Sequence, residues 1–555
     1  MDADAIVVGA GLAGLVAACE LLDAGRRVLL VDQQGAQDLG GQAHWSFGGL
    51  FLVDTPSQRR LGVRDGLELA WQDWQGSAGW DRLGEGGADL WAARWGRAFV
   101  EWAAGEELAW LRAKGIRLTP MVGWAERGGG AATGHGNSVP RFHVAWGTGT
   151  GVSGPFADRV RQAIADGRLD HRPRHRVESL VVEAGAVVGV AGLVLAPDDS
   201  PRGAPSSREA VGSFELRAPA VLLATGGIGG DHDLVRSWWP PSLGAPPRSM
   251  LSGVPAYVDG SGILVAEAAG ARTVNRDRMW HYTEGVRNFA PIWPRHGIRI
   301  LPGPSSMWFD ALGRRLPAPA LPGYDTLATL RWLRTDPEIA GFDHSWFVLD
   351  QRIIEKEFAL SGSEQNPDIT SGSLLRVLRS RLGRGAPAPV EAFKRRGADF
   401  VVADSLDELV RGMNAIGDGA ELTVAGLRSE LAARDAELAN PFAKDVQVQG
   451  IHNARRYRGD RLLRVARPHR ILDPAHGPLI GVRLHVLTRK SLGGIQTDLE
   501  SRALRPDGTP LPGLWAAGEA AGFGGGGLHG ANALEGTFLG GCLFSGRAAG
   551  RSMAG

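Results

Sequence analysis

The segment "AIVVGAGLAGLVAACELLDAGRRVLLVDQQ", residues 5–34, decides the fold of the chain. A short apolar run leads into Gly9-Ala10-Gly11-Leu12-Ala13-Gly14, an alanine- and leucine-rich helix follows, and a second apolar run ends at Asp32. In such a βαβ unit the first glycine permits a tight turn, the second lets the backbone approach a pyrophosphate, and the third lets helix and strand pack closely. Asp32 stands about 20 residues further on, where a carboxylate takes the ribose hydroxyls. The segment therefore predicts an α/β fold with a Rossmann-like domain that binds a dinucleotide.

The composition is that of an ordinary globular protein. The chain has 555 residues, enough for roughly two to four domains or one large split domain. Lys and Arg number 61 and Asp and Glu 60, so no excess charge attracts nucleic acid or anionic lipid. The two cysteines, Cys19 and Cys542, support neither a disulfide framework nor a cysteine metal site, and no run of about 18 apolar residues is present. We expect a soluble, cytoplasmic protein without a bound metal, nucleic acid or integral membrane association.

Glycine is unusually frequent, with 80 of 555 residues, about twice the usual share. Many of these glycines stand where an apolar run gives way to a helix. A second GxGxxG pattern occurs at residues 149–154, but no clean apolar strand precedes it, and Pro155 follows it directly. We interpret it as a loop that opens a helix; the alternative is a second nucleotide site.

The sequence after Asp32 indicates which dinucleotide is bound. "GAQDLGGQAHWSFGGLF" (35–51) carries two glycine pairs with a serine between them, and related patterns follow in "APAVLLATGGIGGDHDLV" (218–235), "DGSGILVAEAAGA" (259–271) and "KSLGGIQTD" (490–498). These motifs resemble the flavoprotein superfamily of fumarate reductase, succinate dehydrogenase and 3-ketosteroid dehydrogenases. The chain looks closest to bacterial FAD-binding dehydrogenases related to the ketosteroid enzymes. The resemblance implies FAD as the cofactor.

The same resemblance assigns cofactor contacts along most of the chain. In the superfamily the glycine loops wrap the pyrophosphate and the flavin edge, and a strand pair meets the adenine. The residues it implies here are Gly9, Gly11, Leu12, Ala13, Gly14, Asp32, Gln33, Gly40, Gly41, Gln42, Ser46, Gly48, Gly49, Val177, Ala224, Thr225, Gly226, Gly262, Gly518, Glu519, Thr537 and Phe538. Some members bond FAD covalently through a histidine before the second glycine pair. Gln42 holds that place here and His44 lies two residues away, so we expect non-covalent FAD.

The C-terminal segment "GLWAAGEAAGFGGGGLHGANALEGTFLGG" (513–541) carries the most glycine. Its apolar strand ends at Gly518-Glu519, and such an acid accepts hydrogen bonds from the ribityl hydroxyls in the superfamily. Thr537 and Phe538 begin a helix whose free N–H groups and positive end would point at the flavin and stabilise the reduced ring. We expect the glycines between these points to let the backbone lie against the isoalloxazine.

These motifs also organise the chain into domains. Residues 1–273 and 484–555 carry flavin motifs and are predicted to form one discontinuous FAD-binding domain. Residues 274–483 carry none, and their proline clusters and helical patterns predict an inserted α+β capping domain, with substrate between the two. The tryptophan-rich helix at 90–111 is interpreted as core; the alternative is an aromatic wall for a flat substrate.

Catalysis on a carbon–carbon bond needs a hydride route to the flavin and a side chain that handles a proton. The resemblance places His281-Tyr282 in a substrate-contacting segment and Lys490 where fumarate reductases carry a histidine. Tyr324 falls near the position of their proton-donating arginine. The ordinary alternative is a packed histidine or tyrosine and a solvent-exposed lysine.

One departure from the superfamily narrows the substrate. Fumarate reductases clamp a substrate carboxylate with an arginine in the "HGAN" segment, and Ala533 stands there here. A dicarboxylate would lose its bidentate partner, whereas backbone N–H groups, Lys490 or a tyrosine can hold a ketone. We expect a dehydrogenase or ene-reductase for a CH–CH bond beside the carbonyl of a hydrophobic ketone such as a 3-ketosteroid, with an undefined electron acceptor. A fumarate-reductase-like enzyme for another unsaturated acid, or a flavin oxidase or monooxygenase, is the alternative.

Overall fold

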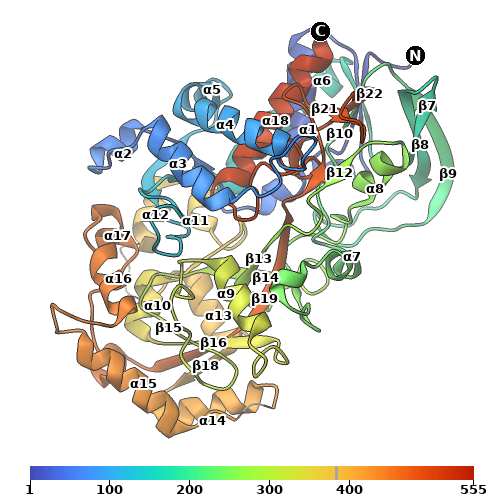
Figure 1. Ribbon diagram of the computed structural model, residues 1–555. Helices are drawn as coiled ribbons and strands as arrows, with labels where there is room; N and C mark the ends of the chain where they lie inside the picture. The colour runs from blue at the N-terminus through green and yellow to red at the C-terminus, as the bar shows by residue number, and fades with distance from the viewer. Residues whose placement is uncertain (382–384, 420) are drawn as a thin grey trace.

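A computed structural model of the protein describes residues 1–381, 385–419 and 421–555. The molecule has two parts (Figure 1). The upper part in that view combines the N- and C-terminal segments around a parallel sheet, and the lower part uses the middle of the chain around a second sheet. Strand β19 (Leu479–Ser491) runs from the lower part into the upper one. The predicted α/β fold, a Rossmann-like part with an α+β insertion, is confirmed.

The central sheet of the first part is parallel apart from one edge strand. Its order is β21 (Arg502–Leu504), β22 (Pro510–Ala516), β10 (Val221–Leu223), β1 (Ala5–Val8), β2 (Val28–Val31) and β6 (Leu169–Arg172), and β21 runs antiparallel to its neighbour. Every residue of β1, β2 and β10 is buried, as expected of parallel strands covered on both faces. Because β22 pairs with β10, the two ends of the chain share one sheet.

The helix of the βαβ unit, α1 (Leu12–Asp23), packs against the C-terminal helix α18 (Thr537–Ala554). Two glycines of α18 make this contact possible. A Cβ at Gly546 would lie 2.5 Å from the carbonyl oxygen of Ala13, and one at Gly550 2.7 Å from that of Ala17. Small residues therefore bring the first and last helices into backbone contact.

Helix α6 (Thr148–Ala165) contains the second GxGxxG pattern in its first turns. A Cβ at Gly149 would lie 2.1 Å from the carbonyl oxygen of Ala43, so this glycine allows close packing on the loop after β2. The pattern opens a helix, as predicted, and its glycines do not line the large cavity described below.

Three small antiparallel sheets and further helices complete the first part. The sheets comprise β7 (His175–Glu183), β8 (Ala186–Leu195) and β9 (Ala210–Arg217); β3 (Gly49–Phe51), β5 (Phe142–Ala145) and β4 (Leu118–Gly123); and β12 (Thr273–Val274) with β20 (Gly494–Ile495). The helices are α2 (Pro56–Arg60), α3 (Leu67–Ala78), α4 (Leu90–Ala104), α5 (Glu107–Ala113), α7 (His232–Ser237) and α8 (Ser261–Ala268). In α4, Trp95, Phe99 and Trp102 are buried in the main core and do not line the large cavity described below, which supports the core interpretation.

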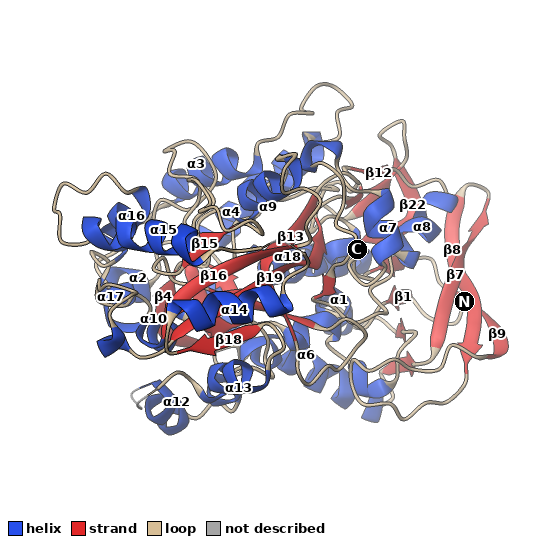
Figure 2. Ribbon diagram, turned by 90° about the horizontal axis from the view of Figure 1, so that it is seen from below, coloured by secondary structure: helices blue, strands red, loops and turns tan. Residues whose placement is uncertain are grey.

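The second part is built on a larger mixed sheet. Its strands are β15 (Met307–Phe309), β16 (His344–Asp350), β19, β13 (Met279–Arg287), β14 (Gly297–Leu301) and β17 (Ala359–Leu360), with β11 (Leu251–Ser252) and β18 (Phe400–Ala403) paired to β19. Its helices are α9 (Thr326–Thr335), α10 (Gln351–Glu357), α11 (Pro367–Thr370), α12 (Leu374–Arg381), α13 (Ala388–Arg396), α14 (Leu406–Ile416), α15 (Val424–Glu437), α16 (Val446–Ala454) and α17 (Arg458–Leu463). Helices α13 and α14 pack against β18 (Figure 2).

The predicted domain boundaries at residues 273/274 and 483/484 both fall within strands. The first lies inside β12, and the second lies inside β19, the longest strand of the second sheet. The sheet of the second part also takes up β11, which precedes residue 273. The division into 1–273, 274–483 and 484–555 stays a prediction.

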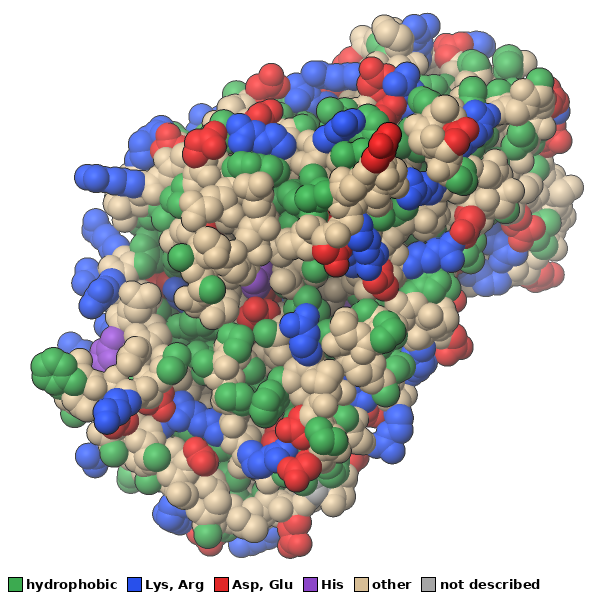
Figure 3. Space-filling view, viewed as in Figure 1, with side chains coloured by type: hydrophobic (Ala, Val, Ile, Leu, Met, Phe, Trp, Pro, Cys, Tyr) green, Lys and Arg blue, Asp and Glu red, His purple; other side chains and the backbone are tan. Residues whose placement is uncertain are grey.

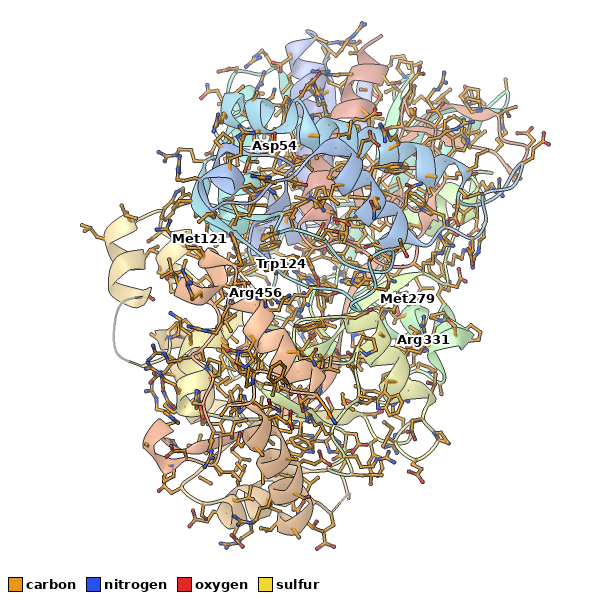
Figure 4. All side chains as sticks on the ribbon, turned by 60° about the vertical axis from the view of Figure 1, so that its left-hand side comes forward. Asp54, Met121, Trp124, Met279, Arg331 and Arg456 are labelled. Carbon is orange, nitrogen blue, oxygen red and sulfur yellow. The ribbon has the colours of Figure 1, made fainter. Side chains whose placement is uncertain are left out.

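The two parts contact each other beside strand β4. Met121 and Trp124 lie near Arg456 at this junction (Figure 4). The hydroxyl of Tyr457 donates to the carbonyl oxygen of Val122 at 2.7 Å. Basic and acidic side chains alternate over the face seen in Figure 3, without a large patch of one sign. Within the described ranges, no helix combines the length and apolar character needed to cross a bilayer.

Candidate functional site

One large cavity lies between the two parts. It holds about 1770 Å³ of open space and is lined by loops that follow β1, β2 and β10 and by strands β13, β14 and β19. The predicted FAD contacts that line it are Gly9, Gly11, Leu12, Ala13, Asp32, Gln33, Gly41, Gln42, Ser46, Gly48, Gly49, Val177, Ala224, Thr225, Gly226, Gly262, Gly518, Glu519 and Phe538. Gly14, Gly40 and Thr537 do not line it. The fold thus gathers motifs from both ends of the chain around one space.

The three glycines of the βαβ loop differ in what surrounds them. Gly9 has φ +101°, and a Cβ there would lie 2.5 Å from the carbonyl oxygen of Ala224. A Cβ at Gly14 would lie 2.0 Å from the carbonyl oxygen of Gly9, so Gly14 supports the loop without lining the cavity. Gly11 has φ −73°, and a Cβ there would lie 3.9 Å from its nearest neighbour. Space therefore remains over Gly11 at the N-terminus of α1, where an anion is favoured.

Asp32 holds this loop in place. Its Oδ2 accepts a hydrogen bond from the backbone N–H of Ala10 at 2.7 Å, and its Oδ1 accepts one from that of Gln34 at 2.7 Å. Gly40, with φ +105°, forms a parallel bridge with Gly11. The first glycine pair is thereby fixed beside the βαβ loop.

Two residues that line the dinucleotide end of the cavity were not predicted from sequence motifs. Tyr257 lines the cavity, and its hydroxyl is buried without a hydrogen-bond partner among the described residues. Asp38 also lines it, and burial raises the pKa of this carboxyl to about 6. The scarcity of tyrosine, with four in the chain, was a usable signal for Tyr257. No local pattern marked Asp38.

A buried polar network connects the two glycine-rich ends of the chain. Gln42 donates to Oε2 of Glu519 at 2.7 Å, and the ammonium of Lys490 lies 3.2 Å from the same oxygen and donates to Oε1 of Gln42. The backbone N–H of Ser491 donates to Oε1 of Glu519 at 3.0 Å. Burial lowers the pKa of Lys490, while the charge of Glu519 opposes that effect. Both oxygens of Glu519 are therefore satisfied within the protein.

Helix α18 begins at the cavity, as predicted, with Gly536 at φ +91° before Thr537. Thr537 accepts or donates a hydrogen bond with Nε2 of His529 at 2.9 Å, and Phe538 faces the cavity. The glycine run 524–527 does not line the cavity. A Cβ at Gly524 would lie 2.6 Å from the ring of Trp95 in α4, and one at Gly526 would lie 2.4 Å from Val274, so these glycines allow internal packing rather than contact with a cofactor ring. The expectation that they face the isoalloxazine is corrected.

Strand β13 separates two of the predicted catalytic residues. Successive side chains of a strand point to opposite faces. Tyr282 lines the cavity, and its hydroxyl has no hydrogen-bond partner among the described residues. His281 is buried on the other face, stacked on Trp239 at 5.5 Å, and accepts a hydrogen bond from the backbone N–H of Arg489. Burial lowers the pKa of His281 to about 3, so its imidazole is neutral.

The other two predicted catalytic residues, Lys490 and Tyr324, also differ in whether they line the cavity. Lys490 lines the cavity from β19 through the network described above. Tyr324 does not line it. Its hydroxyl lies against α16, because a Cβ at Gly450 would be 2.3 Å from that oxygen, and its carbonyl oxygen accepts a hydrogen bond from Gly128. Tyr324 joins the two parts of the molecule outside the cavity.

A buried ionic cluster that no sequence pattern indicated borders the cavity. Arg299 of β14 donates to Glu535 at 2.6 Å and to Glu126 at 3.0 Å, and its Nε lies 3.7 Å from Glu284. Glu126 hydrogen-bonds His135 at 3.0 Å. We call these five residues the Arg299 cluster. Each is at most 9% exposed.

Charge is unevenly balanced in the Arg299 cluster, which has three carboxyl groups around one guanidinium. Burial raises the pKa of Glu284 to about 7 and also raises that of Glu126. Burial alone would lower the pKa of His135, but the hydrogen bond and charge of Glu126 outweigh it and raise the pKa. Arg299 also lies over the ring of Tyr282, 3.6 Å from its centroid. Arg299, Glu535 and Tyr282 form the part of this region that faces the cavity.

The fold and the cavity define an FAD-binding oxidoreductase. The sequence profile of the family described as an FAD binding domain matches residues 4–539, and the chain belongs to this family. It is 60% identical over 554 residues to a KsdD-like steroid dehydrogenase of Mycobacterium tuberculosis, covering 100% of this chain and 96% of that protein. The predicted membership of the flavoprotein superfamily is thereby confirmed.

Solved structures share the fold at much lower identity. A 3-ketosteroid Δ1-dehydrogenase from Sterolibacterium denitrificans, in complex with 1,4-androstadiene-3,17-dione, superposes with a TM-score of 0.67 at 15% identity, covering 100% of this chain and 99% of that one. A 3-ketosteroid-Δ4-(5α)-dehydrogenase from Rhodococcus jostii, in complex with 4-androstene-3,17-dione, gives 0.62 at 19%, covering 100% and 97%.

Proposed function

We propose that the protein is an FAD-dependent dehydrogenase, or ene-reductase, that acts on a CH–CH bond beside the carbonyl of a hydrophobic ketone such as a 3-ketosteroid. The observation that carries this proposal is that one cavity joins the dinucleotide loops to the hydroxyl of Tyr282, which has no hydrogen-bond partner in the described chain. The relative of 60% identity, named a KsdD-like steroid dehydrogenase, supports the substrate class.

The cavity has the character that a flat apolar ketone requires. Away from the dinucleotide loops it is lined by the apolar side chains of Ala125, Phe142, Leu301 and Leu487. Ligand sites of this kind combine an apolar wall with a few polar groups that fix orientation.

Tyr282 is the polar group that we assign to the ketone. Burial raises its pKa well above the ordinary value, so the phenol stays protonated and can donate a hydrogen bond. A donor aimed at the carbonyl oxygen stabilises the negative charge that develops there when the neighbouring C–H bond breaks. His281 and Tyr324 lie outside the cavity, and we give them no role at the substrate.

The residues present fit FAD as the cofactor. The open space over Gly11 at the start of α1 suits a pyrophosphate, and the buried hydroxyl of Tyr257 offers a donor at the same end of the cavity. We propose that the predicted lining residues hold FAD, with Gly14, Gly40 and Thr537 supporting the loops. Bound FAD would supply the two-electron acceptor for the reaction. Glu519 would orient Lys490 and Gln42 beside it.

A dicarboxylate substrate is disfavoured by the charges of the cavity. Ala533, at the clamp position of fumarate reductases, is packed in the core. Arg299 is already paired with carboxylates, and Lys490 is paired with Glu519. Among the described cationic side chains that line the cavity near Tyr282, this leaves Arg489 without a carboxylate partner. A second carboxylate would therefore be buried without a partner, which is costly.

Acid precipitation should release all of the flavin as free FAD. Gln42 occupies the position of the covalent histidine, and His44 does not line the cavity. Within the described part of the chain, the histidine that lines the cavity is His175, beside Val177 at the predicted adenine end. The absorbance of supernatant and pellet measures the outcome. Flavin retained in the washed pellet would contradict non-covalent binding.

We also propose a cytoplasmic location, because both cysteines, Cys19 and Cys542, are unpaired thiols.

The reaction class can be tested by anaerobic mixing of the purified flavoprotein with NADPH and, separately, with 4-androstene-3,17-dione. Only the ketone should bleach the flavin, because no second nucleotide site is apparent at residues 149–154. Rapid bleaching by NADPH together with no response to the ketone would favour a monooxygenase or an NADPH-fed reductase instead.

A further inference from the structure

We propose that Glu535 is the catalytic base that removes the proton from the carbon beside the ketone. The inference rests on the proposed function, because it names the proton acceptor of that reaction. Glu535 lies between the glycine-rich segment and Thr537 and lines the cavity at the same end as Tyr282. It was absent from the residues that sequence motifs suggested.

The two oxygens of Glu535 have different surroundings. Oε1 accepts a hydrogen bond from Arg299 at 2.6 Å and one from the indole of Trp280 at 3.4 Å. Oε2 has no hydrogen-bond partner among the described residues and is not fully buried. One oxygen is thus anchored, and the other faces the cavity. This is the geometry that a base needs if it is to meet a substrate hydrogen without reorienting.

The other carboxylates that line the cavity cannot take this role as easily. Both oxygens of Asp32 accept backbone hydrogen bonds in the dinucleotide loop, and both oxygens of Glu519 are occupied by Ser491, Gln42 and Lys490. Asp38 lies at the dinucleotide end, where the N–H of Gly203 donates to it. Glu535 is therefore the lining carboxylate with a free oxygen near Tyr282.

The other polar side chains at this end are poorer bases. Tyr282 stays protonated because burial raises its pKa, so it acts as a donor. Lys490 is held by Glu519 and Gln42. The guanidinium of Arg299 lies over the ring of Tyr282 and also binds Glu535. It therefore fixes the donor and the base relative to each other.

The proposed step conserves atoms and electrons. The C–H bond beside the carbonyl breaks, and its proton forms a bond with Oε2 of Glu535. The electron pair of that bond would form the new carbon–carbon double bond while the next carbon loses a hydride, for which bound FAD would be the acceptor. Tyr282 holds the carbonyl oxygen throughout. A carboxylate base paired with a strong donor to the oxygen is sufficient for proton removal beside a ketone.

The experiment compares Glu535→Gln with Glu284→Gln, using 4-androstene-3,17-dione in D₂O. Both changes remove a carboxyl from a contact with Arg299, but Glu284 does not line the cavity. Two quantities are measured under anaerobic conditions: flavin bleaching by stopped flow, and deuterium incorporation beside the C3 ketone by NMR. Flavin content and Tm of each variant show whether it is folded and loaded.

Glu535→Gln should lower both rates by about 100-fold or more, the scale of lost general-base catalysis, with FAD content unchanged. Glu284→Gln should stay within a few fold of the native protein, and Glu535→Asp should recover part of the deuterium exchange because it retains a carboxylate. Wild-type rates in Glu535→Gln would overturn the assignment. Equal losses in Glu284→Gln would also overturn it, because the cluster would then act by positioning Arg299.

The two proposals fail in different ways. Bleaching by the native protein that persists in Glu535→Gln refutes the base and leaves the proposed function standing. Deuterium exchange without bleaching, lost in Glu535→Gln, refutes the dehydrogenation and leaves the base standing. A native protein that does neither with this ketone refutes the proposed function, and the base assignment falls with it.

Discussion

Replacing Tyr282 by phenylalanine should slow the reduction of bound flavin by a ketone about 10²–10³-fold, the usual cost of removing one donor to a developing oxyanion. The phenol is 6% exposed, faces the cavity and has no partner in the described protein, so its hydroxyl is available to a ligand. The ring itself stays in place, because phenylalanine preserves the contact with the guanidinium of Arg299. FAD content and Tm should therefore match the native protein.

Tyr324→Phe is the matched control. It removes the same hydroxyl from a half-buried tyrosine that lies against α16 and outside the cavity. Single-turnover bleaching of this variant should equal that of the native protein. Native rates in Tyr282→Phe, or equal losses in the two variants, would remove Tyr282 from the proposed chemistry.

Gly11→Ala should abolish most FAD binding while leaving the chain folded. Gly11 has an ordinary φ of −73°, and an added Cβ would lie 3.9 Å from its nearest neighbour, so the protein alone tolerates alanine. The methyl group would occupy the space proposed for the pyrophosphate. Loss of two charge-assisted hydrogen bonds of about 1.5–3 kcal/mol each corresponds to at least about 100-fold in affinity.

Gly66→Ala serves as the control for this change. Gly66 is also the N-cap of a helix, α3, with extended backbone and no atom within 4 Å of an added Cβ, but it lines no part of the cavity. Both variants should show native far-UV circular dichroism. Flavin retained on dilution by Gly11→Ala to the same extent as by Gly66→Ala would contradict the placement of the cofactor.

The dinucleotide end of the site could be predicted because its signals are local. Gly9, Gly11 and Gly14 stand close together in the loop and at the start of the helix that follows. Gly9 permits the tight turn, Gly11 permits the close approach of a pyrophosphate, and Gly14 permits close packing of the helix. Asp32 directly follows the next strand of the same unit, β2. All of these residues act within one βαβ unit of consecutive sequence, so their pattern can be recognised in the sequence.

The Arg299 cluster could not be predicted for the opposite reason. Glu284 and Arg299 lie on the paired strands β13 and β14 of the second part, but Glu126 and Glu535 come from distant segments of the first part. Only the meeting of the two parts therefore completes the cluster. Motifs of a superfamily also predict which residues lie near a site, but they do not predict the direction in which each side chain points. His281 and Tyr282 are adjacent in sequence, yet the alternation of β13 sends only Tyr282 into the cavity.

The function of the glycine run 524–527 could not be predicted from its sequence. Glycines without side chains indicate that another group packs closely against the backbone, but they do not identify that group. At Gly524 the group that packs closely is Trp95 of helix α4, so the pattern that suggested a cofactor surface reflects internal packing. The flanking residues Gly518, Glu519 and Phe538 do line the cavity.

Anaerobic single-turnover bleaching distinguishes a hydrophobic ketone from a dicarboxylate as the substrate of the protein. The native flavoprotein is mixed in separate experiments with 4-androstene-3,17-dione and with succinate, and the reduced protein is mixed with fumarate. We predict that the ketone bleaches the flavin with formation of a product two mass units lighter, while succinate does not bleach it and fumarate does not reoxidise it. Rapid bleaching by succinate and rapid reoxidation by fumarate, with no response to the ketone, would contradict the proposed function.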